Sequence, residues 1–393
     1  MSRAGWKGKS IQVREFIMEH IIDGRHAVGS AIPSERELAV RCGISRQTVR
    51  AGITELVNDG VLVRRQGKGT FVRTGQPADG GAAAPRTNEI GVLVPNIAPG
   101  YYANLVQNIG QHLSKHALHM LLTAYGAVPE HEAHCMAGMI EKGAAGLIVF
   151  PSYNSFTNQY YHNLKVHDVP FVLLDSPVQG VDADLVHVDN AASAYEGTKA
   201  LIAAGCRRIA FLSGYMTAWT SRERLVGCQK ALWEHGLALG HELVFEGAFH
   251  WRFGYNTAGR LFDRSGDRVD GFVVANHEIT EGVIKAMHER HLRIPHDLRI
   301  CTFEQANVPM HDIFPMVVVS QPAAKMAKAA VETLIERIAE RNRGPARAPA
   351  RHICFDGAVS VPACGRSRHD GRQVAPVGNR PSRVGGALKQ RDE

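Results

Sequence analysis

The chain has 393 residues, a formal net charge of +7 and a hydrophobic fraction of 45%, which is enough to build globular cores. Its length predicts two or more domains. No segment approaches 18 consecutive apolar residues, and the first twenty residues hold neither an apolar stretch nor a small-residue cleavage site. We therefore expect neither a transmembrane helix nor export, and we place the protein in the cytoplasm with no membrane partner.

The positive charge is concentrated at the two ends of the chain. Residues 1–75 contain 13 Lys and Arg against 7 Asp and Glu, residues 365–393 contain 7 against 3, and the region between them contains 25 against 28. A basic head and tail around a mildly acidic middle predict that the ends, and mainly the head, contact a polyanion.

The first half of the head predicts two helices. Residues 10–23 place apolar side chains at helical spacing, which indicates a helix with one buried face. These side chains are Val13, Phe16, Ile17 and Ile21. Ser34 followed by Glu37 is a capping-box pattern, and it predicts a second helix over residues 34–42 that Gly43 ends.

A third helix and a hairpin complete the head. Ser45 predicts the start of the third helix, and two capped helices so close together predict a helix-turn-helix. The segments VLVRR, QGKG and TFV predict two short strands around a glycine-rich turn, which would form a wing. The outward face of the third helix carries Arg46, Gln47 and Arg50, which are groups that can read base edges in the major groove. Lys68, between two glycines, could reach the phosphates or the minor groove.

These four segments resemble the winged-helix head of GntR-type bacterial transcription regulators. The matching stretches are PSERELA at residues 33–39, SRQTVR at 45–50, LVNDGVL at 56–62 and GKGTFV at 67–72. The resemblance implies that double-stranded operator DNA is contacted by Arg36, Arg46, Gln47, Thr48 and Arg50, and by a wing tip made of Gln66, Gly67 and Lys68.

The rest of the chain divides by composition. Residues 76–88, rich in Gly, Ala and Pro, predict a flexible linker after a DNA-binding domain at residues 1–75. Residues 89–364 alternate short apolar runs with amphipathic stretches, which predicts parallel α/β lobes with helices on both faces of each sheet. Residues 365–393 are basic and poor in apolar residues, and we expect them to be disordered.

Residues 89–364 resemble the two-lobed effector domain of LacI-type repressors, which is similar to periplasmic sugar-binding proteins. The resemblance rests on the order of IGVLVP (90–95), GLIVFP (146–151), PFVLLD (170–175), VDN (188–190), AGCRRIAFLSG (204–214), SRERLVG (221–227), GFVVAN (271–276) and ICTFE (300–304). The combination is similar to arabinose repressors, which join a GntR head to a LacI-like body. The fold class we expect is therefore an α+β winged helix-turn-helix head followed by an α/β two-lobed, periplasmic-binding-protein-like domain.

Ligands of open parallel sheets bind beyond the carboxyl ends of the strands. The resemblance implies an effector site made of Asp189, Arg224, Asn276 and Glu304, with Tyr102 or Tyr101 from the first lobe and a stacking ring, Trp251 or Phe249, from the second. Asp189 could instead cap the following helix. His277 and the pair at residues 304–305 depart from the family pattern, so a phosphorylated, acidic or non-sugar effector stays open beside a sugar.

No residue pattern predicts a metal site, a cofactor or an enzyme. The seven cysteines are scattered without a C-x-x-C pair, and His131 and His134 beside Glu130 and Glu132 are interpreted as a solvated helix face. No nucleophile elbow, P-loop or GxGxxG occurs in a fitting context. We predict a homodimeric, effector-responsive repressor; the alternative is a solute-binding or enzymatic α/β protein with an incidental basic module.

Overall fold

The computed structural model describes residues 13, 16, 17, 20, 26, 29–58, 61–72, 88–98, 100–126, 129–153, 158–166, 168–263, 268–303, 314–343 and 348–362. The predicted tail lies outside these residues, as does all but the last residue of the predicted linker. Within the described residues, no helix is both long enough and apolar enough to cross a bilayer.

The head contains the predicted helix-turn-helix and wing. Val13 and Ile17, from the predicted first helix, are helical and fully buried. They pack with apolar residues of the following elements in one core. These elements are α2 (Glu35–Cys42), α3 (Arg46–Asn58), β1 (Leu62–Arg65) and β2 (Gly69–Val72), and the two strands pair antiparallel.

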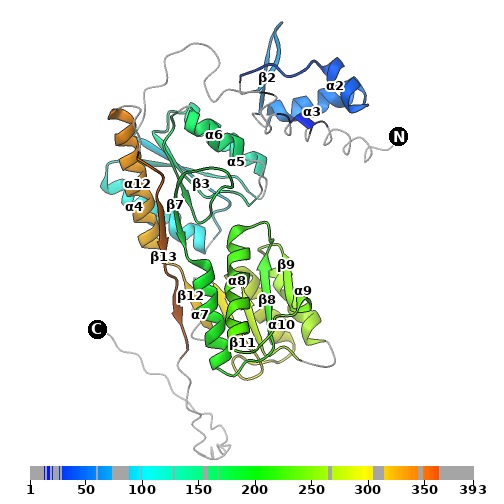
Figure 1. Ribbon diagram of the computed structural model, residues 1–393, viewed down its shortest axis with the longest axis vertical. Helices are drawn as coiled ribbons and strands as arrows, with labels where there is room; N and C mark the ends of the chain where they lie inside the picture. The colour runs from blue at the N-terminus through cyan, green and yellow to red at the C-terminus, as the bar shows by residue number, and fades with distance from the viewer. Residues whose placement is uncertain are drawn as a thin grey trace, which may run out of the picture. The chain divides into compact units, whose positions relative to one another are not determined.

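The first lobe of the body is a six-stranded parallel sheet in the order β13-β7-β6-β5-β3-β4. Helices α4 and α12 cover one face and α5 and α6 the other (Figure 1). Strands such as β5 and β6 are buried along their whole length, which is why they read as unbroken apolar runs. The elements are β3 (Glu89–Val94), α4 (Tyr101–Lys115), β4 (His119–Ala124), α5 (Pro129–Glu141), β5 (Gly146–Val149), α6 (Asn158–Val166), β6 (Phe171–Leu174), β7 (Asp184–Val188), α12 (Ala323–Arg343) and β13 (His352–Phe355).

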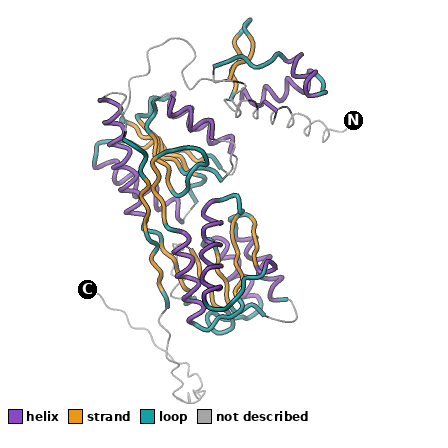
Figure 2. The backbone as a smooth tube through the Cα atoms, viewed as in Figure 1, coloured by secondary structure: helices purple, strands orange, loops and turns teal. Residues whose placement is uncertain are grey.

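The second lobe repeats this plan of a sheet between helices (Figure 2). Its strand order is β14-β12-β11-β10-β8-β9, and only β14 runs antiparallel to its neighbour. Helices α7 and α8 cover one face, and α9 and α10 cover the other. The elements are α7 (Asn190–Ala203), β8 (Ile209–Gly214), α8 (Trp219–Glu234), β9 (Val244–Gly247), α9 (Trp251–Phe262), β10 (Gly271–Val274), α10 (His277–Glu289), β11 (Arg299–Phe303), β12 (Val317–Ser320) and β14 (Ala358–Ser360).

The described chain passes between the lobes three times, at Asp189, at residues 321–322 and at residues 356–357. The Asp189 N–H donates to the Phe355 carbonyl at 2.9 Å, so the first and third crossings are hydrogen-bonded to each other. Side chains that lie at the carboxyl ends of the strands in either lobe therefore converge on one region between the lobes.

A buried ion pair fixes the last helix to the first sheet. Arg337 of α12 binds Asp184 of β7 through two nitrogen–oxygen contacts of 2.6 and 2.7 Å, and both side chains are less than 10% exposed. The hydrogen bonds to Asp184 raise the pKa of Arg337 above its ordinary value.

Close helix packing in the second lobe depends on glycine. At Gly227 of α8, a Cβ atom would lie 2.0 Å from the carbonyl oxygen of Ala191 in α7, so that the two helices can approach only where a side chain is missing. Gly138 of α5 offers a contrast, because a Cβ there would meet nothing within 4 Å.

We predict that Gly227→Ala lowers the free energy of unfolding by about 1–3 kcal/mol, because α7 and α8 must move apart to admit the methyl group. Gly138→Ala is the matched control, and it should be neutral or slightly stabilising because alanine is the better helix former. Urea denaturation of the two variants and the parent measures both effects. Equal stability of the two variants would contradict the close packing of α7 on α8.

Candidate functional site

The helix-turn-helix is built by the local signals that its sequence contains. The Ser34 hydroxyl accepts from the Glu37 N–H at 3.3 Å and the Glu37 carboxylate accepts from the Ser34 N–H at 2.8 Å, which completes the predicted capping box. Gly43 then ends α2 with a left-handed φ of 65°. The Ser45 hydroxyl accepts from the Thr48 N–H at 3.2 Å and so starts α3.

Most of the predicted DNA contacts are exposed, and one is not. Arg36, Arg46, Gln47 and Arg50 are exposed, as are Gln66, Gly67 and Lys68 at the turn between β1 and β2. Thr48 is only 3% exposed, and its hydroxyl shares a 2.8 Å hydrogen bond with Ser45. The structure therefore places Thr48 in the cap of α3, while the other seven residues are exposed to solvent. Their contact with DNA stays a prediction.

An ion-pair network that the sequence does not reveal orients the exposed face. The Arg50 guanidinium donates to both oxygens of Glu35 at 2.9 to 3.1 Å, and Arg64 of β1 lies 3.8 Å from the same carboxylate. The hydrogen bond from Arg50 holds the pKa of Glu35 below its ordinary value. Glu35 thus joins α2, α3 and the wing, and it holds Arg50 in one orientation.

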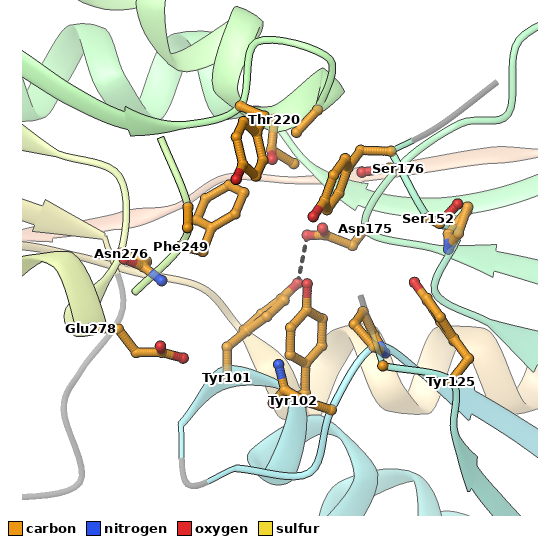
Figure 3. Close-up of a pocket in the computed structure, with 18 of the residues that line it drawn as sticks. Tyr101, Tyr102, Tyr125, Ser152, Asp175, Ser176, Thr220, Phe249, Asn276 and Glu278 are labelled. Carbon is orange, nitrogen blue, oxygen red and sulfur yellow. Dashed lines mark hydrogen bonds between the residues drawn. The ribbon is translucent and has the colours of Figure 1, made fainter. Parts of the chain in front are cut away.

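A cavity of about 400 Å³ lies where the carboxyl ends of strands from both lobes meet (Figure 3). Its volume falls within the range of about 300–1,000 Å³ that is typical of small-molecule sites. Aromatic rings line it together with a few polar groups. The lining residues are Pro95, Asn96, Tyr101, Tyr102, Tyr125, Gly126, Pro151, Ser152, Tyr153, Asp175 and Ser176 from the first lobe, and Tyr215, Ala218, Thr220, Arg224, Ala248, Phe249, Asn276 and Glu278 from the second.

In the first lobe, the tyrosines at the start of α4 meet a carboxylate that follows β6. The Tyr101 hydroxyl donates to Asp175 at 2.8 Å (Figure 3). Tyr102 lies against Phe150, with the ring edge of one toward the face of the other at 5.4 Å. Asp175 has a φ of 79°, a left-handed conformation that aspartate and asparagine adopt more readily than most residues.

In the second lobe, Arg224 of α8 is held on several sides. Its Nε donates to the Asn190 side chain at 2.8 Å, an Nη donates to the Ala275 carbonyl, and the guanidinium lies 4.0 Å from the centre of the Phe303 ring. Arg224 is 4% exposed, so that only a small part of the guanidinium is left to the cavity.

Asn276 and Phe249 complete this wall. The Asn276 oxygen accepts from the Ile279 N–H at 3.0 Å and caps α10, which directs its amide group toward the cavity (Figure 3). The Phe249 ring lies so close to the Gly214 backbone that a Cβ at Gly214 would be 1.9 Å from it. Asn276 can therefore act as a hydrogen-bond donor beside a fixed aromatic face.

The structure brings together three of the six predicted effector residues, Tyr102, Arg224 and Asn276. Asp189 does not line the cavity, because its carboxylate accepts from the Ala192 N–H at 2.8 Å and caps α7. Trp251 does not line it either, because its ring packs against Tyr255 within α9; the alternative ring, Phe249, does. Glu304 lies outside the described residues.

Several lining residues were missed by the sequence analysis. Asp175 and Glu278 follow strands β6 and β10 and could have been found by the rule that ligands bind at carboxyl ends of strands. The same rule applies to Tyr215, which directly follows β8, and to Tyr153, which follows β5. Their rings lie 6.0 Å apart, and Tyr153 also lies 6.5 Å from Phe249, so that aromatic side chains of the two lobes meet beside the cavity.

One prediction about the first lobe is wrong. Glu132 was assigned to a solvated helix face with His131 and His134, but it is fully buried. Its carboxylate accepts from the Tyr161 hydroxyl and, at 3.2 Å, from the N–H of Ser152, a cavity residue. Burial raises the pKa of Tyr161 well above its ordinary value, so that the phenol stays protonated and donates. The Glu132 carboxylate thus ties the loop after β5 to helix α5.

We predict that Glu132→Ala lowers the free energy of unfolding by about 2–3 kcal/mol, because the buried Tyr161 hydroxyl and the partly buried Ser152 N–H lose their acceptor. It should also speed hydrogen exchange at residues 150–153, where the loop is held by this carboxylate. His134→Ala, on the exposed side of the same helix, is the control. Thermal unfolding and exchange mass spectrometry measure the two effects, and a Glu132 variant that matches the control would contradict the assignment.

Among the described residues, no group of three or more His, Cys, Asp or Glu is arranged to hold a metal ion. The cavity instead combines hydrogen-bond donors, carboxylates and aromatic faces, which are the groups that recognise a polar ring-shaped ligand.

Comparisons with known proteins agree with this architecture. Residues 9–72 match the family model of bacterial regulatory proteins of the gntR family, and residues 198–354 match a periplasmic binding protein-like domain. The arabinose metabolism transcriptional repressor of Geobacillus stearothermophilus is 26% identical over 342 residues, which cover 85% of this chain and 92% of the relative. The ribose operon repressor of Haemophilus influenzae is 27% identical over 256 residues, covering 65% and 76% respectively.

The crystal structure of the transcription regulator CcpA of Lactococcus lactis matches with a TM-score of 0.61 at 25% identity, and the match covers 70% of this chain and 98% of that one. The fold expected from the sequence is thereby confirmed. The chain joins a helix-turn-helix domain of the GntR family to a periplasmic-binding-protein-like domain, which is the architecture of chimeric GntR/LacI-like regulators.

Proposed function

We propose that this chain is a ligand-responsive transcriptional repressor, which binds double-stranded operator DNA through its winged helix and a small sugar-like effector in the interlobe cavity. The observation that carries the proposal is the cavity, where polar and aromatic side chains from both lobes lie together. The same chain also has an exposed face of Arg and Gln side chains on α3. The named relatives are repressors of arabinose metabolism and of a ribose operon, which supports a saccharide as the effector.

The mechanism that we propose couples the two sites through a homodimer in the cytoplasm. Two heads bind two operator half-sites, and effector binding draws the lobes together around the cavity. This movement changes the spacing of the two heads and releases the operator. A coupling free energy of about 1–3 kcal/mol between the sites is enough to change operator occupancy severalfold or more. This mechanism needs no cofactor, because it consists of binding steps and no ligand is chemically changed.

We predict that two single variants separate the sites. Arg50→Ala should weaken operator binding by about tenfold to a hundredfold, through the loss of a guanidinium that can bond to base edges, and it should leave effector affinity unchanged. Arg224→Lys should do the reverse, because lysine lacks the planar fork that reaches Asn190 and Ala275 from two nitrogens and lies over the Phe303 ring. Fluorescence anisotropy with labelled operator and calorimetry with the effector measure the two affinities.

Thermal unfolding of both variants serves as the control for folding. If each variant lost operator affinity and effector affinity in the same proportion, the proposal of two distinct sites would fail.

We further predict that Glu35→Gln lowers the preference for operator over random duplex DNA severalfold. Without its charge, Glu35 no longer fixes Arg50 and no longer repels phosphates, so binding to any sequence should rise relative to operator binding. Glu37→Gln is the matched control, since it removes the same charge from the same helix while glutamine can still complete the capping box. Gel-shift titrations against operator and random duplex measure the ratio, and equal ratios in the two variants would contradict a role for the Glu35–Arg50 pair.

A further inference from the structure

A histidine of the first lobe packs against a tryptophan of the second lobe, outside the cavity. The ring of His187, on β7, lies 5.3 Å from the ring of Trp219, on α8, and the two ring planes are at 76° to each other. Both residues are partly buried, and neither is among the described residues that line the cavity. Because β7 and α8 belong to different lobes, this contact depends on how the lobes are arranged.

The contact lies between a crossing of the chain and the cavity wall. His187 is two residues before the first crossing, at Asp189. Trp219 is the first residue of α8, and the residues on both sides of it, Ala218 and Thr220, line the cavity. A movement of Trp219 away from His187 therefore also moves this part of the cavity wall away from the first lobe.

The surroundings of His187 disfavour its protonated form. Desolvation by burial lowers the pKa of His187 below its ordinary value, and the nearby His352 of β13 acts in the same direction. The Val188 carbonyl, 3.2 Å from the ring nitrogen, and the carboxylates of Asp189 and Glu223 favour the protonated form. The lowering effects are the larger ones, so His187 loses its proton more readily here than in water.

Two other neighbours do not reverse this balance. Cys354 of β13 is the strand partner of His187, and desolvation raises the pKa of its thiol, which therefore stays neutral. The start of α8 at Trp219 has neither a side-chain cap nor an acidic residue in the first turn. A helix N-terminus has partial positive charge, which further disfavours a protonated imidazole beside it.

Proton binding and the contact are therefore linked. When the start of α8 moves away from the first lobe, water reaches the His187 ring and its pKa rises toward the ordinary value of about 6.5. A fall in pH favours the arrangement in which a group has the higher pKa. The contact is thus fully favoured above about pH 6.5, and it is weakened as the pH falls through this value and then through the lowered pKa of His187.

We propose that the contact between His187 and Trp219 makes the arrangement of the lobes sensitive to pH, because protonation of His187 moves the start of α8 away from the first lobe. For effector binding, the inference rests on the proposed function and adds the proton as a second regulator. The displaced cavity wall binds effector more weakly, so that more effector is needed to release the operator in acid.

Nuclear magnetic resonance titration of the histidine rings in the full chain tests the contact. The signal of His187 is assigned by its loss in His187→Phe, which keeps an aromatic ring beside Trp219. We expect the pKa of His187 to lie below about 6.5, and we expect Trp219→Ala to raise it by about 0.5 or more, because the ring becomes exposed to water. The same pKa in the parent and in Trp219→Ala overturns the inference.

The response of the lobes is measured by energy transfer between one fluorophore on each lobe, attached at the exposed positions Lys115 and Glu281. Without ligand, the transfer efficiency of the parent should change between about pH 7.5 and about pH 5.5, with the midpoint of the His187 titration. This change should be absent in His187→Phe. His288→Phe is the matched control, since it removes an exposed histidine of α10, and it should respond like the parent. A response that persists in His187→Phe, or a parent that does not respond, contradicts the proposal.

Arabinose binding separates this inference from the proposed function. In calorimetry, we expect the parent to bind arabinose about twofold to tenfold more weakly at about pH 5.5 than at about pH 7.5, and His187→Phe to lose most of this difference. If the parent binds arabinose equally at both pH values, the inference fails and the proposed function stands. If arabinose does not bind while energy transfer follows the titration of His187, the pH-sensitive contact is supported and arabinose as the effector is contradicted.

Discussion

The guanidinium of Arg224 joins the parts of the body on which a response to ligand depends. It reaches Asn190 beside the first crossing, the carbonyl of Ala275 at the end of β10, and the ring of Phe303 at the end of β11, while it also lines the cavity. A ligand that contacts this side chain therefore touches the crossing and two strands through one group. Because the guanidinium is a buried hydrogen-bond donor, each of its partners is costly to remove.

The position of the cavity follows from parallel strands and close helix packing. All strands that end at the cavity run parallel, so their carboxyl ends lie at the same edge of each sheet. The helices that follow these strands begin at that edge. Gly227 lets α8 approach α7 closely, and this close packing determines the position of the Arg224 backbone on α8. Glu132 supports the opposite wall through Ser152, so that both sides of the cavity are held by buried polar groups and not by loops alone.

The sequence predicts best what is decided locally. The capping box of Ser34 and Glu37, the glycine at the end of α2 and the alternation of strands and helices all appear as expected. The site is predicted less well, because its residues are brought together by tertiary contacts. The position of a residue after a strand does not predict that Asp189 caps α7 while Asn190 binds Arg224. It also does not predict that Phe249 lines the cavity and Trp251 does not. The burial of Glu132 depends on Tyr161 and Ser152, which are distant in sequence.

In the proposed mechanism, the cavity and the winged helix are two sites linked by one free energy of coupling. Linkage makes such coupling reciprocal: a ligand that weakens operator binding by some factor must itself bind more weakly, by the same factor, to the operator complex. The most direct test is to measure the affinity of the best-binding sugar by calorimetry with and without saturating operator. We expect a weaker affinity in the presence of operator, by the factor found for operator release. Equal affinities in the two titrations would contradict it.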